Sequence, residues 1–451
     1  MKPTPNTLGF TLSYGALNSI ANLGVLLPYL FILLAYNQLH STALLIGLLT
    51  IYTTRAVSFL GGLHLRLKSS QYLLLNLLCG LLGALIYTIA PSTTLWLIIG
   101  GLPLGYSAAT LWPYFLTIKL HATTYGTFAP KPYHWFIFLL SLGGVIGIDL
   151  LHPSLHLAFG ALAILYAAAL PSAIRLVYNL APVYQQADLH ADQRPRMWRL
   201  VPLLFFAGII ASLALARKQS VGGYLYPLLI ALILIAFVMT LRELLLDTKL
   251  LADIDIRLVF RGFLLNFVLF YATFYGGLFW GTHGPLVIFS TYLIGFQIGP
   301  RLPKWFPVLI DHRQLLDRWW PLSATLLIIL NQPWTFVLGI LLLSLYVGFL
   351  NPYFNNDLYF KSGLSKDVAL FYKYRLSAYG SQLFQLCFFA LLLTFGVTQH
   401  FSIIMFFKLT PTLATALHHS TIGPLNDLID GLLLIGWGVA NWRLRRSSST
   451  K

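Results

Sequence analysis

The chain has 451 residues, of which 58% are hydrophobic and only 9% are charged, and its mean hydropathy is +0.76. This apolar surface exceeds what a soluble core can bury, so the composition excludes a soluble globular protein and predicts an integral membrane protein. The formal net charge of +16 does not indicate nucleic-acid binding, because the basic residues lie in short connections between apolar segments rather than in one basic domain.

Apolar segments of about 20 residues recur along the chain, which is the length a helix needs to cross a hydrocarbon layer of about 30 Å. The alternating pattern of a membrane barrel is absent. The predicted fold class is therefore all-α, a polytopic membrane protein. Cys79 and Cys387 each lie inside an apolar segment, which predicts packing roles rather than a disulfide or a thiolate metal site.

The first half of the chain contains six predicted spans joined by short polar links. Pro91 and Pro153 mark two of the outer turns. The predicted spans are residues 9–36, 41–63, 71–90, 94–118, 134–151 and 155–177.

A polar connector at residues 184–199 interrupts this pattern, and an additional helix pair is predicted after it, at 200–215 and 223–241. Residues 243–257 mix charge with leucine at helical spacing, so this segment is expected to lie on the inner membrane face or to extend a helix. Residues 400–419 are expected to form an outer loop. The remaining predicted spans are 258–281, 285–302, 319–330, 334–354, 369–395 and 425–442.

The predicted organisation is a bundle of about 14 spans, arranged six, two and six. It comprises an N-terminal six-helix half at 1–180, a cytoplasmic connector at 181–199, the extra pair with its interfacial segment at 200–256, and a C-terminal six-helix half at 257–451. An even number of spans places both termini on one side. Most basic connections share that side, which predicts cytoplasmic termini and a location in the plasma membrane.

Two apolar segments match each other at a fixed offset of 239 positions, residues 94–115 and residues 333–354. Gly100 corresponds to Gly339, and both segments end in the tripeptide Pro-Tyr-Phe, at 113–115 and 352–354. Such a match indicates a duplicated half, which is one way in which transporters are built.

Two six-span blocks with a basic connector and this internal match resemble the major facilitator superfamily. The extra pair resembles the fourteen-helix arrangement of its drug:proton antiporter branch. Gly61 and Arg66 match the family's loop motif Gly-x-x-x-Asp-Arg-x-Gly-Arg-Lys, while Leu65 and Lys68 stand where Asp and Gly are expected. The resemblance implies two halves around a central site, with the second and eleventh core helices as neighbours.

Arg55 lies about nine residues from the inner end of its predicted span, a depth of roughly 13 Å. A charged residue at this depth is a candidate substrate-binding group, and the alternative is a structural tether between helices. Tyr379 and Gln382 share a face within the most polar mid-span run. The resemblance would let Gln382 meet Arg55, and hydrogen bonding between helices is the alternative role.

Three acids lie inside or at the edges of the predicted spans and are candidates for proton coupling. They are Asp149, Asp427 and Asp430, of which Asp430 is the best placed, while Asp149 is also explained by interface exposure.

Aromatic and amide side chains in the spans that would line the cavity suggest a pocket for a hydrophobic or amphipathic ligand. For each of these residues taken alone, helix packing or a position at the membrane interface is the favoured explanation. The candidates are Asn18, Asn22, Tyr106, Trp112, Asn266, Tyr271, Tyr275 and Tyr346.

These observations predict a secondary active transporter, not an enzyme, that works by alternating access and exports a hydrophobic or amphipathic small molecule, with proton coupling. We expect a monomer that contacts membrane lipids and uses no cofactor, metal or nucleic acid. His418-His419 is a weak metal signal, and no ATP-binding glycine loop occurs. The alternatives are a flippase for a glycolipid or lipid-linked intermediate, a membrane-embedded transferase acting on a lipid-linked substrate, and a non-transporting scaffold.

Overall fold

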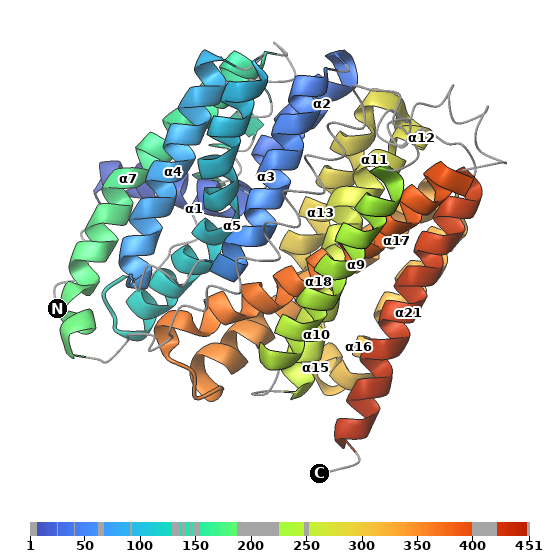
Figure 1. The fold of residues 1–451 in the computed structure, drawn as a ribbon. Coiled ribbons are helices and arrows are strands. Elements are labelled where there is room, and N and C mark those ends of the chain that lie inside the picture. Colours follow the sequence, from blue (N-terminus) through green and yellow to red (C-terminus); the bar gives the residue numbers. More distant parts are fainter. Residues whose placement is uncertain are drawn as a thin grey trace. The chain divides into compact units, whose positions relative to one another are not determined.

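The computed structural model describes residues 7–24, 26–39, 41–61, 67–90, 93–128, 154–186, 225–247, 252–398 and 422–448, with isolated helical residues between 136 and 147. Helices joined by turns make up these ranges, and no strand occurs in them (Figure 1). The all-α prediction is therefore confirmed for the described residues. Most of the predicted fifth span, the predicted span at 200–215 and the predicted outer loop at 400–419 lie outside them.

The chain divides into two compact units. Unit 1 comprises Met1–Leu203 together with Gly363–Tyr372, a short segment from much later in the chain. Its described helices are α1 (Leu8–Leu23), α2 (Leu27–Leu39), α3 (Thr42–Gly61), α4 (Ser69–Ile89), α5 (Thr94–Thr124) and α7 (Leu155–Gln186).

Unit 2 comprises Leu204–Ser362 and Lys373–Lys451, so the long helix α18 (Lys366–Thr398) begins in unit 1 and continues in unit 2. Short helical turns join several of its longer helices. Its principal helices are α9 (Leu225–Asp247), α10 (Ala252–Asn266), the π-helix η2 (Phe267–Ala272), α11 (Thr273–Tyr275), α12 (Gly277–Trp280), α13 (Gly284–Ile298), α16 (Arg313–Ile329), α17 (Pro333–Asn356), the π-helix η5 (Asp357–Lys361) and α21 (Gly423–Ser448).

The first predicted span is not one helix. Instead of a continuous helix over 9–36, the structure has α1 and α2, whose axes differ by 58°. Gly24 ends α1, and Pro28 follows at the second position of α2. Proline lacks an amide hydrogen and its ring clashes with the carbonyl four residues earlier, so the helix breaks at this point.

Most of the longer described helices overlap predicted spans, and several extend beyond them. The predicted span at 94–118 belongs to α5, which continues to Thr124, and the predicted span at 319–330 belongs to α16, which begins at Arg313. Residues 243–247 end α9 and residues 252–257 begin α10, so the described parts of the expected interfacial segment extend helices. Six described helical stretches are long and apolar enough to cross a membrane, or seven if α1 and α2 form one broken span.

The two units repeat one packing pattern. In unit 1, α5 packs against α3 and α4, and α7 packs against α1 and α4. In unit 2, α17 packs against α13 and α16, and α21 packs against α10 and α16. The matched glycines have the same role: a methyl group on Gly100 would lie 2.8 Å from Ile86 Cγ2 of α4, and one on Gly339 would lie 2.6 Å from Ile328 Cγ1 of α16. Each glycine lets its helix approach the preceding one closely.

Candidate functional site

A chain of hydrogen bonds in unit 2 joins one buried acid to the π-helix η2. Asp430 of α21 is only 3% exposed, and its Oδ2 accepts a hydrogen bond from Asn426 Nδ2 at 2.9 Å. The hydroxyl of Tyr271 donates to Asn426 Oδ1 at 2.8 Å. Asp430 Oδ1 has no hydrogen-bond partner among the described residues. One carboxylate oxygen is therefore held by a neutral amide, and the other is left without a donor.

The position of Tyr271 follows from the local backbone. Residues 267–272 adopt π-helical geometry, which adds a residue to the turn and leaves carbonyl groups without their usual partners. The hydroxyl of Thr273 takes up two of these carbonyls, those of Leu269 and Phe270, each at 2.8 Å. π-Helical turns of this kind occur frequently at functional sites, and here the turn carries Tyr271 toward Asn426.

Aromatic rings surround this chain. The ring of Tyr271 stacks on those of Phe267 and Tyr275, with centroid distances of 5.5 and 5.4 Å. Tyr275 donates its hydroxyl to Asn331 Oδ1 at 2.9 Å, and Asn331 adopts a positive φ of 52° between α16 and α17. Asn266 precedes the π-helix and is buried, and its Oδ1 has no hydrogen-bond partner in the described part of the chain. The site is an apolar aromatic shell with a small number of amides and one acid.

The structure therefore places four predicted site residues, Tyr271, Tyr275, Asn266 and Asp430, on or beside η2 and α21. Asp427 lies one turn before Asp430 on α21, but its side chain is exposed. The two acids thus differ in environment although sequence spacing put them on one face. Asp149 lies outside the described residues.

Other predicted site residues belong to unit 1. Arg55 is half-buried, with its Cζ 5.8 Å from the centroid of the Tyr29 ring, which itself packs 4.3 Å from the ring of Tyr52. Asn22 Nδ2 bonds the carbonyl of Asn18 at 2.7 Å and its Oδ1 at 3.3 Å. Two further half-buried candidates, Tyr106 and Trp112, lie on α5.

Three further predicted site residues belong to unit 2. Tyr346 donates to Asp317 Oδ1 at 3.4 Å, and Asp317 forms an ion pair with Arg257, so Tyr346 belongs to a different polar network. Tyr379 and Gln382 are completely buried on α18. The predicted meeting of Gln382 with Arg55 joins different units and stays a prediction.

Sequence reasoning missed a group of buried cations on α10 and α18. Lys373 has no exposed side-chain surface, and Arg261 and Arg375 are 2% and 3% exposed. Each lies inside a predicted apolar span, so a charged residue within a span was the available signal. Asn426 was missed as well, because a single amide at a helix start carries no distinguishing pattern.

An acid that sequence reasoning missed, Asp367, lies in unit 1 at the start of α18. Its Oδ2 accepts from the backbone amide of Ser69 at 3.0 Å. Its Oδ1 accepts from the Ser69 hydroxyl, from the Tyr184 hydroxyl at 3.2 Å and from His121 Nε2 at 3.3 Å. The acid precedes the predicted span at 369–395, so hydropathy placed it in a loop.

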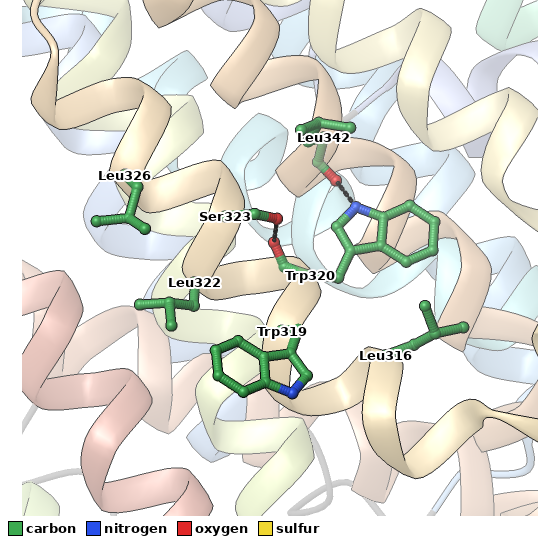
Figure 2. A pocket seen from close by; sticks show the side chains of 7 residues that line it. All are labelled: Leu316, Trp319, Trp320, Leu322, Ser323, Leu326 and Leu342. Carbon is green, nitrogen blue, oxygen red and sulfur yellow. Dashed lines mark hydrogen bonds between the residues drawn. The ribbon is translucent and has the colours of Figure 1, made fainter.

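A groove of about 410 Å³ lies along α16 and α17 in unit 2. The indole N–H of Trp320 donates to the backbone carbonyl of Leu342 at 3.0 Å (Figure 2). The hydroxyl of Ser323 donates to the backbone carbonyl of Trp320 at 2.9 Å. These bonds are internal, and the remaining lining is apolar, with Trp319 and Leu326 largely exposed. This largely apolar surface suits contact with lipid tails.

Comparison with solved structures shows proteins with a similar helical fold. No protein-family model and no curated protein matches the sequence. The structure is similar to a crystal structure of the peptide transporter POT in complex with sulfate, with a TM-score of 0.57, 14% identity and coverage of 98% of this chain and 96% of that chain. A mutant POT structure gives a TM-score of 0.56 at 13% identity, and the nucleoside transporter NupG gives 0.49 at 13% identity.

At these identities the POT comparison establishes the fold alone. The chain shares the helical fold of the peptide transporter POT.

Proposed function

We propose that this protein is a secondary active transporter that works by alternating access, exports a hydrophobic or amphipathic small molecule and couples this export to protons through Asp430. The fold and the packing pattern repeated in the two units support transport, because such repeats let one unit move against the other around a binding site. The aromatic shell around Tyr271 and Tyr275 supports an apolar substrate.

The observation that carries the coupling proposal is the environment of Asp430. Proton coupling needs a carboxylate that gains and loses a proton as its surroundings change. Asp430 is buried, has one amide donor and keeps one oxygen without a partner among the described residues. Protonation would remove a charge from an apolar site, and deprotonation would be favoured when the site opens to water.

Asp427 provides a matched control because it lies three residues earlier on the same helix and is exposed. Purified Asp430→Asn, Asp427→Asn and unmodified proteins would be placed in liposomes with an imposed pH gradient and tested with a panel of fluorescent amphipathic probes. We expect Asp430→Asn to lose gradient-driven accumulation at least tenfold while it retains probe exchange without a gradient. Asp427→Asn should behave as the unmodified protein does.

Full gradient-driven accumulation by Asp430→Asn would refute coupling through this residue. Absence of both accumulation and exchange by the unmodified protein, across the panel, would refute the transport proposal itself.

The number of spans, the orientation, the oligomeric state and the location are proposed from the sequence. We propose fourteen spans arranged as in the drug:proton antiporter branch, with the domain limits given above, cytoplasmic termini, a monomeric state and a location in the plasma membrane. Accessibility labelling of single cysteines at each terminus in intact cells tests the orientation.

A further inference from the structure

Two buried cations of unit 2, Lys373 and Arg261, lie close to the same aromatic ring, that of Tyr374. Lys373 Nζ lies 5.0 Å from the centroid of the Tyr374 ring, and Arg261 Cζ lies 5.7 Å from the same centroid. Arg261 also donates to the hydroxyl of Ser377 at 3.2 Å. Ser377 is four residues after Lys373, so both lie on one face of α18. Arg261 on α10 is therefore directed toward the face that carries Lys373.

The hydrogen bonds of Lys373 do not neutralise its charge. The ammonium group donates to Asn351 Oδ1 and, at 2.7 Å, to Asn355 Oδ1, both neutral amides of α17. It forms no ion pair with any carboxylate of the described residues. An ammonium group carries three donors, so one remains after these two bonds.

Arg257 provides a contrast within the same unit. It lies one turn before Arg261 on α10 and forms an ion pair with Asp317. Arg257, whose side chain is 18% exposed, therefore has a carboxylate partner. Lys373, which is completely buried, has none among the described residues. Burial of an ammonium without a counterion is unfavourable and marks a functional group in a membrane protein.

We propose that Lys373 and Arg261 bind an anionic group, a carboxylate or a phosphate, on the transported substrate. A guanidinium presents a planar pair of donors that matches either oxyanion, and the ammonium adds a point charge beside it. Tyr374 and the aromatic side chains of this unit would contact the apolar part of the same molecule. The substrate class is then an amphipathic organic anion.

This inference rests on the proposed transport function, because the cluster is closed to solvent in this structure. Alternating access supplies the open state in which the anion enters. In the closed state, the side-chain oxygens of Asn351 and Asn355 accept the hydrogen bonds of the Lys373 ammonium that the anion would otherwise accept.

The test uses the full chain in detergent and four probes, three of which share one ring system. The probes are 1-naphthoate, 1-naphthyl phosphate, the neutral alcohol 1-naphthylmethanol, and inorganic phosphate alone. At constant ionic strength, saturating anionic probe should raise the Tm by about 3 °C, because binding to the native state stabilises it. The neutral alcohol should leave the Tm unchanged. The two anionic arms distinguish carboxylate from phosphate.

Variants separate binding at this cluster from general anion effects. Lys373→Gln should abolish the Tm shift, whereas Lys361→Gln, which removes an exposed lysine, should retain it. Asn351→Asp places a carboxylate beside Lys373, so it should raise the Tm without any probe and remove the response to anions. This second variant keeps the test valid if Lys373→Gln does not fold.

Equal Tm shifts for the neutral and anionic probes, or an unchanged anion response in Asn351→Asp, would overturn the inference. Counterflow of the same probes in liposomes reads the transport function separately. Movement of neutral probes with no Lys373-dependent anion binding would leave transport standing and overturn the anion site. Lys373-dependent binding with no movement of any probe would support the site and overturn transport.

Discussion

Replacing Asp367 with Asn should destabilise unit 1 because this carboxylate holds the ends of three helices. Ser69 begins α4, His121 lies near the end of α5 and Tyr184 lies near the end of α7. Asp367 accepts hydrogen bonds from all three and is 5% exposed. Because a carboxylate only accepts, His121 must carry its proton on Nε2 in this arrangement.

The size of the stability loss in Asp367→Asn follows from the hydrogen bonds that the side-chain amide of Asn cannot make. If its oxygen takes the place of Oδ1, its NH₂ group faces the backbone amide of Ser69, and two donors oppose each other. The unsatisfied amide costs about 1–3 kcal/mol, and the bonds to the other oxygen lose their charge-assisted part. The expected loss is about 4 kcal/mol, which corresponds to a fall in Tm of roughly 8 °C.

Thermal unfolding in detergent measures this loss, and hydrogen exchange locates it. Ser69 is the first residue of α4, so its amide has no acceptor within the helix and depends on Asp367. Its exchange should become at least tenfold faster in Asp367→Asn. Asp357→Asn is the control, because Asp357 pairs with the exposed Lys361 and should lose only about 0.5 kcal/mol. An unchanged Tm with unchanged exchange at Ser69 would refute the reasoning.

Gly339→Ala should lower stability by about 1–3 kcal/mol in thermal unfolding, because its methyl group would lie 2.6 Å from Ile328 Cγ1. Gly438→Ala meets no atom within 4 Å and should raise stability by about 0.5–1 kcal/mol, so equal effects of the two would contradict the close approach of α16 and α17. Tyr271→Phe removes the donor to Asn426, and we expect it to shift the pH profile of probe transport while the Tm falls by only a few degrees. An unchanged pH profile would place Tyr271 outside the coupling chain.

Hydropathy predicted where most of the longer described helices lie but not where they end. α5 extends six residues beyond its predicted end at Ile118, and the added part contains His121, which is completely buried. α18 begins at Lys366, three residues before its predicted start. A helix continues past the hydrocarbon layer as long as its backbone bonds and side-chain contacts remain favourable, and an average over apolar residues cannot register those contacts.

The candidate site was predicted in part. Residue type and position within the spans predicted Tyr271, Tyr275 and Asp430, which lie on η2, α11 and α21, respectively. Their connection depends on Asn426, whose role comes from its position one turn before Asp430 and opposite Tyr271. The π-helical turn that places Tyr271 has no marker in the sequence, because it depends on how Thr273 bonds the preceding carbonyls.

Two buried aspartates of similar exposure have opposite surroundings, and their hydrogen bonds separate a structural acid from a titrating one. Asp367 has donors on both oxygens, so its charge is satisfied and its loss should be felt as stability. Asp430 has one amide donor and an oxygen without a partner, so neutralising it removes an unfavourable buried charge at little structural cost. Asp430→Asn should therefore keep or raise the Tm while it abolishes coupling, whereas Asp367→Asn should lower the Tm. A large stability loss in Asp430→Asn would assign Asp430 to the structural class and leave unit 2 without its coupling acid.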